Sequence, residues 1–316
     1  MNELGKARRP FVFLIDFDFR QPLLFGWEES KSQLLWKTPH FNNYETPNTP
    51  CPDFHWQVKP VSYARYRQAF ELVQSHIHNG DSYLLNLTMP SRVETNLDLE
   101  TIFHQSHAPY LVYLKDRFVC FSPEIFVRIE QGRISSNPMK GTIDANLPDA
   151  ENRLKTDPKE LAEHHTIVDL IRNDLSRVAD QVEVPRFCYI DKIKADQASL
   201  LQMSSEISGQ LPEYYHEHLG DIFARLLPAG SISGAPKKKT IEIIKAAEGY
   251  ERGYYTGVFG VFDGTNVDSC VLIRYLEQQD SQLVFKSGGG ITHLSQCDDE
   301  YHELIKKVYV PITRNH

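Results

Sequence analysis

The sequence predicts a globular protein that mixes β-strands and α-helices. Short apolar runs bounded by turn residues recur along the chain, and two of them, at 110–114 and 118–121, have the spacing of a β-hairpin. Other segments carry apolar residues at helical spacing behind capping residues such as Ser62 and Asp157. The 316 residues are 41% hydrophobic and 24% charged, so the chain can bury a large core. Length alone leaves open whether it forms two ordinary domains or one large one.

Composition narrows the classes of partner and compartment. The net charge of −8 and the pI of about 5.9 argue against a nucleic-acid or anionic-membrane surface. The 5 cysteines include no Cys-x-x-Cys pair and are typical of reduced thiols in a cytosolic protein. Residues 1–10 are polar and basic, and no apolar run approaches the ~20 residues of a membrane span. We therefore expect a soluble, cytoplasmic protein that binds a small metabolite or a protein partner.

The first half of the chain is predicted to contain several short strands and two helices. The strands lie at 11–16, 23–27, 82–89, 110–114, 118–121, 125–130 and 133–136. A helix begins after Ser62 as N-cap and ends at Asn79-Gly80. Its apolar stripe consists of Tyr66, Ala69, Phe70, Val73 and Ile77. A second, short helix is predicted near 98–105.

The second half begins with a well-marked helix. Asp157 as N-cap, Pro158 at the first helical position and an acid at the third predict a helix from there to about Val178. A further helix is expected at 214–227 and a last one at 298–309, with strands at 183–185, 186–194, 199–211, 257–262, 267–276 and 283–286. The last of these strands runs into a turn made by Gly288, Gly289 and Gly290.

Lys140 is the first candidate site residue, because Pro138 and Gly141 enclose it in a predicted turn. We expect this turn to be a stiff loop that holds the lysine side chain in place. A lone Pro-x-Lys-Gly is more often a solvated turn lysine. Upstream, however, Glu124 directly follows a predicted strand in Ser122-Pro123-Glu124, a common place for a site residue.

Two Glu-x-x-Glu pairs form the second candidate site. Glu160 and Glu163 share one face of the helix that starts at Asp157, and Glu300 and Glu303 share a face of the last helix. Each pair alone is typical of a solvated helix face. Together, four carboxylates could hold one hard cation such as Mg²⁺, which would in turn bind a substrate carboxylate.

Two further features suit an anionic ligand. The small-residue loop 228–236 opens onto a helix whose N-terminal amides suit a carboxylate, although a plain flexible connection is the alternative and the loop does not match a nucleotide phosphate loop. Arg274 lies inside an apolar predicted strand, where its guanidinium needs an anionic partner. That partner is either a structural carboxylate of the protein or a substrate carboxylate.

Seven sequence motifs stand in a fixed order along the chain: Gly80–Thr88, Ser122–Glu124, Pro138–Thr142, Glu163–Leu175, Gly230–Lys237, Arg252–Gly257 and Gly288–Ile291. With these motifs in this order, residues 62–311 resemble the chorismate-utilising enzymes, while residues 1–61 diverge from them. The first 61 residues show no match to the tryptophan-binding stretch of longer relatives, so feedback by tryptophan is not supported. We expect residues 1–316 to form a single catalytic domain.

The resemblance implies an α+β fold, a four-layer sandwich in which two antiparallel sheets stack between helices around a central cleft. It implies Mg²⁺ bound directly by Glu163 and Glu303, and through water by Glu160 and Glu300. It also implies a set of substrate-binding residues: Thr142, Gln202, Ser231, Tyr255, Arg274, Gly288, Gly289 and Gly290. Gln202 stands where many relatives have a histidine, and it cannot shuttle a proton.

Within the family, Lys140 implies 4-amino-4-deoxychorismate synthesis for 4-aminobenzoate and folate, because anthranilate and isochorismate synthases usually carry alanine there. Lys140 would add to the ring as the hydroxyl leaves, Glu124 would protonate that hydroxyl, and ammonia would then displace the lysine. Leu84 replaces the water-activating lysine of isochorismate synthases. No cysteine has the Gly-x-Cys-x-Gly setting of a glutaminase, so ammonia from glutamine requires a partner amidotransferase. Anthranilate synthase component I and a non-catalytic chorismate-binding homologue are the alternatives.

Overall fold

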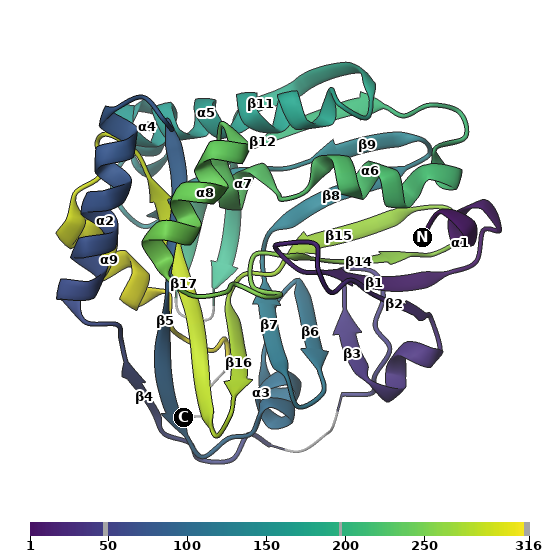
Figure 1. The fold of residues 1–316 in the computed structure, drawn as a ribbon, viewed down its shortest axis with the longest axis horizontal. Coiled ribbons are helices and arrows are strands. Elements are labelled where there is room, and N and C mark those ends of the chain that lie inside the picture. The colour runs from purple at the N-terminus through teal and green to yellow at the C-terminus, as the bar shows by residue number, and fades with distance from the viewer. Residues whose placement is uncertain (47–49, 196–197, 313–316) are drawn as a thin grey trace. The chain divides into compact units, whose positions relative to one another are not determined.

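The computed structural model describes residues 1–46, 50–195 and 198–312, in which the strands form two antiparallel sheets accompanied by helices (Figure 1). The chain divides into two compact units. Unit 1 contains residues 1–10, 124–231 and 262–269, and unit 2 contains residues 11–123 and 232–261 and the chain from Cys270 onward. Each unit is described by itself.

Unit 1 is built on long antiparallel strands. β9 (Arg133–Ser136) and β10 (Met139–Asp144) follow one another along the same edge of β12 (Ala198–Gln210), and β8 (Ile125–Glu130) pairs with β9. β11 (Asp180–Ala195) also pairs with β12. Helix α5 (Pro158–Leu175) contacts β10, β11 and β12, so it presents the first Glu-x-x-Glu pair beside this sheet. The unit also contains α1 (Asn2–Lys6), α4 (Ala150–Thr156), η2 (Tyr215–His218) and α6 (Leu219–Leu226).

The eight-stranded sheet belongs to unit 2. Its strands lie in the order β13 (Gly234–Ala235), β5 (Leu84–Thr95), β17 (Gln282–Ile291), β16 (Tyr275–Gln279), β7 (Phe118–Ser122), β6 (Tyr110–Leu114) and β3 (Leu34–Lys37), with β4 (Trp56–Lys59) paired to β5. The unit also contains the β1 (Phe11–Ile15) and β2 (Leu23–Gly26) hairpin and η1 (Glu29–Ser32). Three elements contain residues of both units: α7 (Gly230–Ser233), β14 (Val258–Phe262) and β15 (Val267–Val271).

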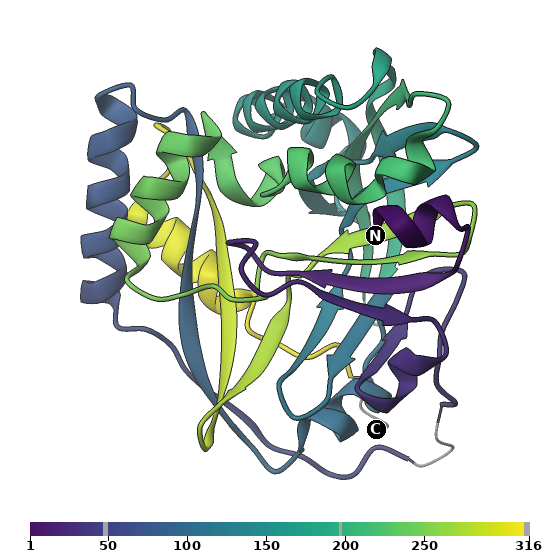
Figure 2. The ribbon, with the colours of Figure 1, turned by 45° about the vertical axis from the view of Figure 1, so that its right-hand side comes forward.

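Three helices of unit 2 lie beside strands β5 and β17 of its sheet. α2 (Tyr63–His78), α8 (Lys237–Glu248) and α9 (Cys297–Lys306) contact one another or the strands β5 and β17 (Figures 1 and 2). Their buried apolar side chains form one core cluster with Leu85, Leu87 and Met89 of β5. A second cluster packs α3 (Leu99–Gln105) against residues of β6, β7 and β16. Burial of α9 against this sheet holds the second Glu-x-x-Glu pair next to β17.

The helices α2 and α5 and the hairpin, whose signals are local in the sequence, form as predicted. The Ser62 side chain accepts a hydrogen bond from the Arg65 backbone at the start of α2, and the five residues of the predicted stripe are the buried ones. Asp157 likewise accepts from the Glu160 backbone at 3.1 Å, with Pro158 as the first residue of α5. The predicted hairpin is formed by β6 and β7.

Three predictions about site-bearing segments are wrong. Lys140 lies in strand β10, and the register with β12 shifts between Lys140 and Thr142 because Gly141, at φ +71°, forms an irregularity in the pairing. The predicted strand 267–276 is broken, since Arg274 has φ +54° and the chain leaves one sheet and enters the other there. The glycines 288–290 do not form a turn but continue β17.

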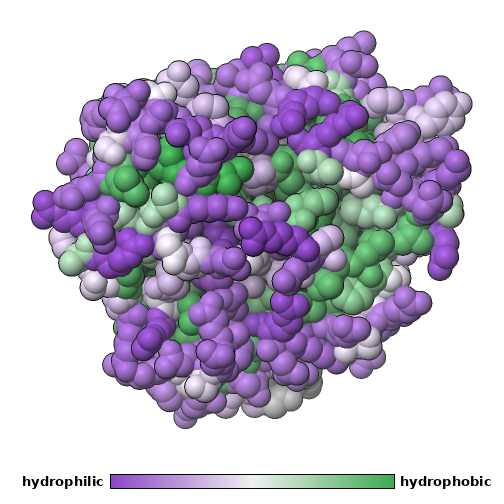
Figure 3. Space-filling model, in the orientation of Figure 1, coloured by the Kyte–Doolittle hydropathy of each residue, from purple (hydrophilic) through white to green (hydrophobic). Residues whose placement is uncertain are grey.

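Smaller differences concern element boundaries. Residues 183–194 form part of one long strand instead of two. The helix predicted at 214–227 is divided into η2 and α6. The five cysteines are thiols and not disulfides, as the sequence predicted. Hydrophilic residues cover most of the face of the molecule drawn in Figure 3, and among the described residues no helix is both long enough and apolar enough to span a membrane.

Candidate functional site

Lys140 of unit 1 is held beside a carboxylate of the first Glu-x-x-Glu pair. Its Nζ lies 3.4 Å from Oε2 of Glu163 on α5, and the two side chains are only 26% and 11% exposed. A partly buried ion pair of this kind is screened less by solvent than a surface pair. Strand β10 and helix α5 therefore present an amine and a carboxylate to one another.

The irregularity at Gly141 makes room for the other glutamate of the pair. A Cβ at this position would lie 3.0 Å from Oε2 of Glu160 and 2.8 Å from Cδ1 of Leu154. Because the backbone also has a positive φ here, a residue with a side chain would be strained as well as crowded. Gly141 thus lets the Glu160 carboxylate approach the backbone of β10.

Thr142 and Gln202 are brought together by strand pairing. They are opposite one another in the register of β10 and β12, directly after the shift at Gly141. Lys140 itself is opposite Met203, which is fully buried. Four of the predicted residues of unit 1, Lys140, Thr142, Gln202 and Glu163, therefore lie on adjacent elements.

Glu124 and Ser231 form a second small constellation in unit 1. The Ser231 hydroxyl donates a hydrogen bond of 2.6 Å to Oε1 of Glu124, which directly precedes β8. Both residues line a small cavity of about 20 Å³, together with Asp174 of α5 and several apolar side chains. The predicted acid and the predicted pocket-lining hydroxyl are thus direct partners.

His164 is a buried polar residue to which the sequence analysis gave no role. It is fully buried, and its Nε2 lies 2.6 Å from the Ser205 hydroxyl, which also accepts from the Cys188 backbone at 3.0 Å. Burial, reinforced by His165 and Lys140, lowers the pKa of His164 to about 4. The imidazole is therefore neutral at pH 7. A histidine directly after Glu163 was a visible signal, but only packing shows that it points inward.

In unit 2, the glycines of β17 run against β5. Gly288, Gly289 and Gly290 are opposite Thr88, Leu87 and Asn86, respectively. A Cβ at Gly288 would lie 2.2 Å from the Leu87 carbonyl oxygen, so only glycine fits. The close backbone approach explains why this strand carries glycines at all.

The second Glu-x-x-Glu pair converges on the same glycines. A Cβ at Gly289 would lie 3.2 Å from Oε1 of Glu303 and 3.5 Å from Oε2 of Glu300. Glu300 is only 5% exposed, whereas half of the Glu303 side chain is exposed. Because Gly289 has no side chain, the two carboxylates and the Lys307 ammonium can approach the backbone of β17.

Lys307 is a further charged residue of this site that the sequence analysis missed. Its Nζ lies 2.6 Å from Oε1 of Glu303 and donates to the Gly288 carbonyl oxygen at 2.8 Å. The i,i+4 spacing from Glu303 was the available signal, because it places both side chains on one helix face. In both units, therefore, a lysine lies next to a predicted metal ligand: Lys140 next to Glu163 and Lys307 next to Glu303.

Arg274 and Tyr255 also belong to unit 2. The Arg274 guanidinium donates to the Lys307 carbonyl oxygen at 3.1 Å, so it caps the C-terminal end of α9. Tyr255 is 3% exposed, and burial raises the pKa of its phenol, which is neutral at pH 7. Arg274, Gly288, Gly289, Glu300 and Glu303 are therefore gathered around α9 and β17.

Both units present carboxylate oxygens, which are the kind of ligand that Mg²⁺ prefers. In unit 1 the Glu160 carboxylate lies beside Gly141, and in unit 2 the Glu300 and Glu303 carboxylates lie beside Gly289. Within the described residues, no group of three or more His, Cys, Asp or Glu side chains is close enough to form a metal site. The two carboxylate pairs belong to different units.

Sequence comparison decides the family. The chorismate binding enzyme family matches residues 24–313, which is most of the chain. The chain belongs to this family. It is 52% identical to an uncharacterized PabA-like protein of Pasteurella multocida, over 98% of this chain and 97% of the relative. It is 30% identical to aminodeoxychorismate synthase component 1 of Klebsiella aerogenes, over 94% of this chain and 67% of the relative.

A solved structure supports the same assignment. Anthranilate synthase component I of Streptococcus pneumoniae superposes with a TM-score of 0.69 at 25% identity, covering 82% of this chain and 59% of that one. The α+β fold of a chorismate-binding enzyme, with two antiparallel sheets and helices, is therefore confirmed.

Proposed function

We propose that this chorismate-binding enzyme is component I of an aminodeoxychorismate synthase, which makes 4-amino-4-deoxychorismate from chorismate and ammonia. The observation that carries the proposal is Lys140, whose amine is held on β10 at 3.4 Å from Glu163. The resemblance implies alanine at this position in anthranilate and isochorismate synthases. An aminodeoxychorismate synthase among the relatives adds support.

The proposed reaction uses Lys140 and Glu124. A bond forms between the lysine Nζ and one ring carbon while the carbon–oxygen bond at another ring carbon breaks, and Glu124 gives the leaving hydroxyl a proton so that it departs as water. Ammonia then bonds to the carbon that lost the hydroxyl, the carbon–nitrogen bond to lysine breaks, and the Glu124 carboxylate takes up the proton that the new amine loses. The Ser231 hydroxyl, which donates to Glu124 at 2.6 Å, orients that carboxyl.

Substrate binding in this proposal falls mainly to unit 2. Tyr255, Arg274 and the glycines 288–290 would bind the substrate carboxylates, while Thr142 and Gln202 would contact the substrate from unit 1. Mg²⁺ would be held directly by Glu163 and Glu303, and through water by Glu160 and Glu300. When bound, the metal would neutralise substrate carboxylate charge. A partner amidotransferase would supply ammonia from glutamine in the cytoplasm.

Incubation of the purified chain with chorismate, Mg²⁺ and ammonium, followed by mass spectrometry, tests the proposal. We expect 4-amino-4-deoxychorismate from the wild type and a large loss of it from Lys140→Ala. Lys155→Ala is the matched control, because Lys155 lies in unit 1 but is paired with Glu151 on the exposed face of α4. Anthranilate as the product would favour an anthranilate synthase, and chorismate binding without turnover would favour a non-catalytic homologue.

A further inference from the structure

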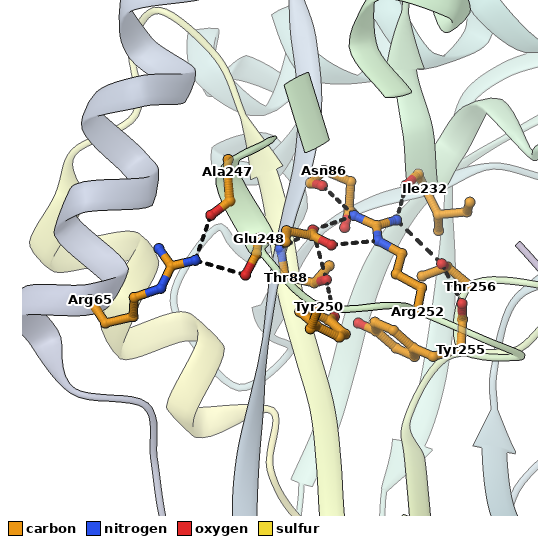
Figure 4. A network of polar contacts seen from close by, with 10 residues as sticks. All are labelled: Arg65, Asn86, Thr88, Ile232, Ala247, Glu248, Tyr250, Arg252, Tyr255 and Thr256. Carbon is orange, nitrogen blue, oxygen red and sulfur yellow. Dashed lines mark hydrogen bonds and ion pairs between the residues drawn. The ribbon is translucent and has the colours of Figure 1, made fainter. Parts of the chain in front are cut away.

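Unit 2 contains a buried ion pair to which the proposed function gives no role. Arg252 and Glu248 are 2% and 4% exposed, and the guanidinium meets the carboxylate with two hydrogen bonds (Figure 4). Arg252 Nε donates to Oε2 at 2.9 Å and Nη2 to Oε1 at 2.6 Å. Burying two charges is costly unless their remaining hydrogen-bonding capacity is satisfied, so the further partners of the pair identify what it holds in place.

Arg252 joins three backbone segments. Its Nη2 donates to the Asn86 carbonyl oxygen on β5 at 2.7 Å, and its Nη1 to the Ile232 carbonyl oxygen at 3.0 Å. Nη1 also donates to the Thr256 hydroxyl at 3.2 Å, and that hydroxyl donates to the Tyr255 carbonyl oxygen at 2.5 Å. One guanidinium therefore links β5 to the segment that carries Tyr255 (Figure 4).

Glu248 completes the attachment to β5. Its Oε1 accepts from both the backbone and the hydroxyl of Thr88, each at 2.8 Å. Thr88 is opposite Gly288 in the sheet, and Asn86, which Arg252 contacts, is opposite Gly290. The pair thus holds the strand segment against which the three glycines are paired.

We propose that Glu248 and Arg252 are positioning residues that set the Tyr255 segment and the glycines 288–290 in the relative geometry that binds the carboxylates of chorismate. This inference rests on the proposed function, because it takes these groups to be the substrate-binding ones. The pair acts through β5 and through Thr256, and neither charged group contacts substrate.

The test uses two conservative variants and a control at the same helix end. Arg252→Lys keeps the charge but loses the planar fork, and Glu248→Gln keeps the shape but loses the charge. Arg65→Gln is the control, because Arg65 Nη2 donates to the Ala247 and Glu248 carbonyl oxygens, both at 2.7 Å, and the hydrogen bonds that Figure 4 draws from Arg65 lead to these two residues and not to β5 or Tyr255.

Chorismate binding and turnover would be measured by calorimetry and steady-state kinetics, with a thermal melt of each variant. We expect Kd and KM for chorismate to rise about 10-fold or more in Arg252→Lys and Glu248→Gln, because a rise of this size corresponds to the loss of one charge-assisted hydrogen bond. The change in kcat should be much smaller. Arg65→Gln should lower the melting temperature and leave KM unchanged. The double variant Arg252→Lys with Tyr255→Phe should lose less binding free energy for chorismate than the sum of the losses in the two single variants.

Two failures can be told apart. If the wild type binds no chorismate, the proposed function fails. If the wild type binds chorismate and the folded variants bind it equally well, or if KM rises equally in Arg65→Gln, the positioning role is overturned. Should the charge variants not fold, Thr88→Val removes one hydrogen bond to Glu248, together with the contact of 2.6 Å between the Thr88 and Tyr250 hydroxyls, and keeps both charges. An unchanged KM in that variant would overturn the inference too.

Discussion

Replacing Gly289 by alanine tests whether the two carboxylates beside this glycine form part of a cation site. The added Cβ would lie 3.2 Å from Oε1 of Glu303, 3.5 Å from Oε2 of Glu300 and 3.6 Å from Nζ of Lys307. The shortest of these contacts is tighter than ordinary van der Waals contact, but all three neighbours are side-chain ends. They can move by a few tenths of an ångström without disturbing the backbone.

The expected effect is therefore on binding and not on folding. Alanine in a strand interior recovers about 0.5–1 kcal/mol of the backbone entropy that glycine costs, which offsets the crowding. Displaced carboxylates, in contrast, weaken a site whose geometry Mg²⁺ demands closely, and we expect about a 10-fold loss of Mg²⁺ affinity, or roughly 1.4 kcal/mol. Titration calorimetry with Mg²⁺ in the presence of chorismate measures this, and calorimetric melting measures stability.

Gly288→Ala is the matched control for Gly289→Ala. Its Cβ would lie 2.2 Å from the Leu87 carbonyl oxygen and 2.7 Å from the Thr88 Cα, and both are backbone atoms. Two paired strands would have to separate, so we expect a loss of about 1–3 kcal/mol or more in stability, with or without Mg²⁺. The reasoning is refuted if Gly289→Ala binds Mg²⁺ as tightly as the wild type, or if Gly288→Ala melts at the wild-type temperature.

Four further results are expected. Chelation of Mg²⁺, or either Glu163→Gln or Glu303→Gln, should abolish turnover, and full activity in excess chelator would remove the metal from the proposal. With chorismate and Mg²⁺ but no ammonia, peptide mass spectrometry should find an adduct on Lys140 that Glu124→Gln suppresses; a wild-type rate in Lys140→Ala without any adduct would exclude covalent catalysis. The purified chain should use ammonia but not glutamine, which product formation from glutamine alone would contradict. Because the folded chain lowers the pKa of His164 to about 4 from an unfolded value near 6.5, its neutral form stabilises the fold above pH 6.5, and up to roughly 3 kcal/mol is lost as pH falls towards 4. Acid unfolding of His164→Gln should show a shallower dependence over this range, and an identical profile would refute the assignment.

Local patterns in the sequence determined much of the scaffold. The capping residues Ser62 and Asp157 and the apolar stripe of α2 were predictable, because a helix start and a helix face depend on residues three or four positions apart. The same spacing placed Glu160 beside Glu163, and Glu300 beside Glu303. The family motifs within 62–311 predicted the α+β fold.

Only the tertiary structure decided how the site segments run. Lys140 lies in a strand instead of a loop because β12, some 60 residues later in the chain, offers β10 an edge to pair with. Arg274 lies at a break because the chain changes sheets there, and the glycines 288–290 stay extended because β5 pairs with them. Propensity within a short window contains no information about which distant strand is adjacent.

The buried polar contacts also depend on tertiary structure and not on local sequence. Thr88 and Glu248 are 160 residues apart, and Arg252 and Asn86 are 166 apart, yet they form one buried network. A sequence pattern marks a glutamate and an arginine four positions apart as a helix-type pair, which suggests a solvated surface. Burial turned that pair into a link between β5 and the Tyr255 segment, because buried charges must find hydrogen-bond partners wherever packing places them.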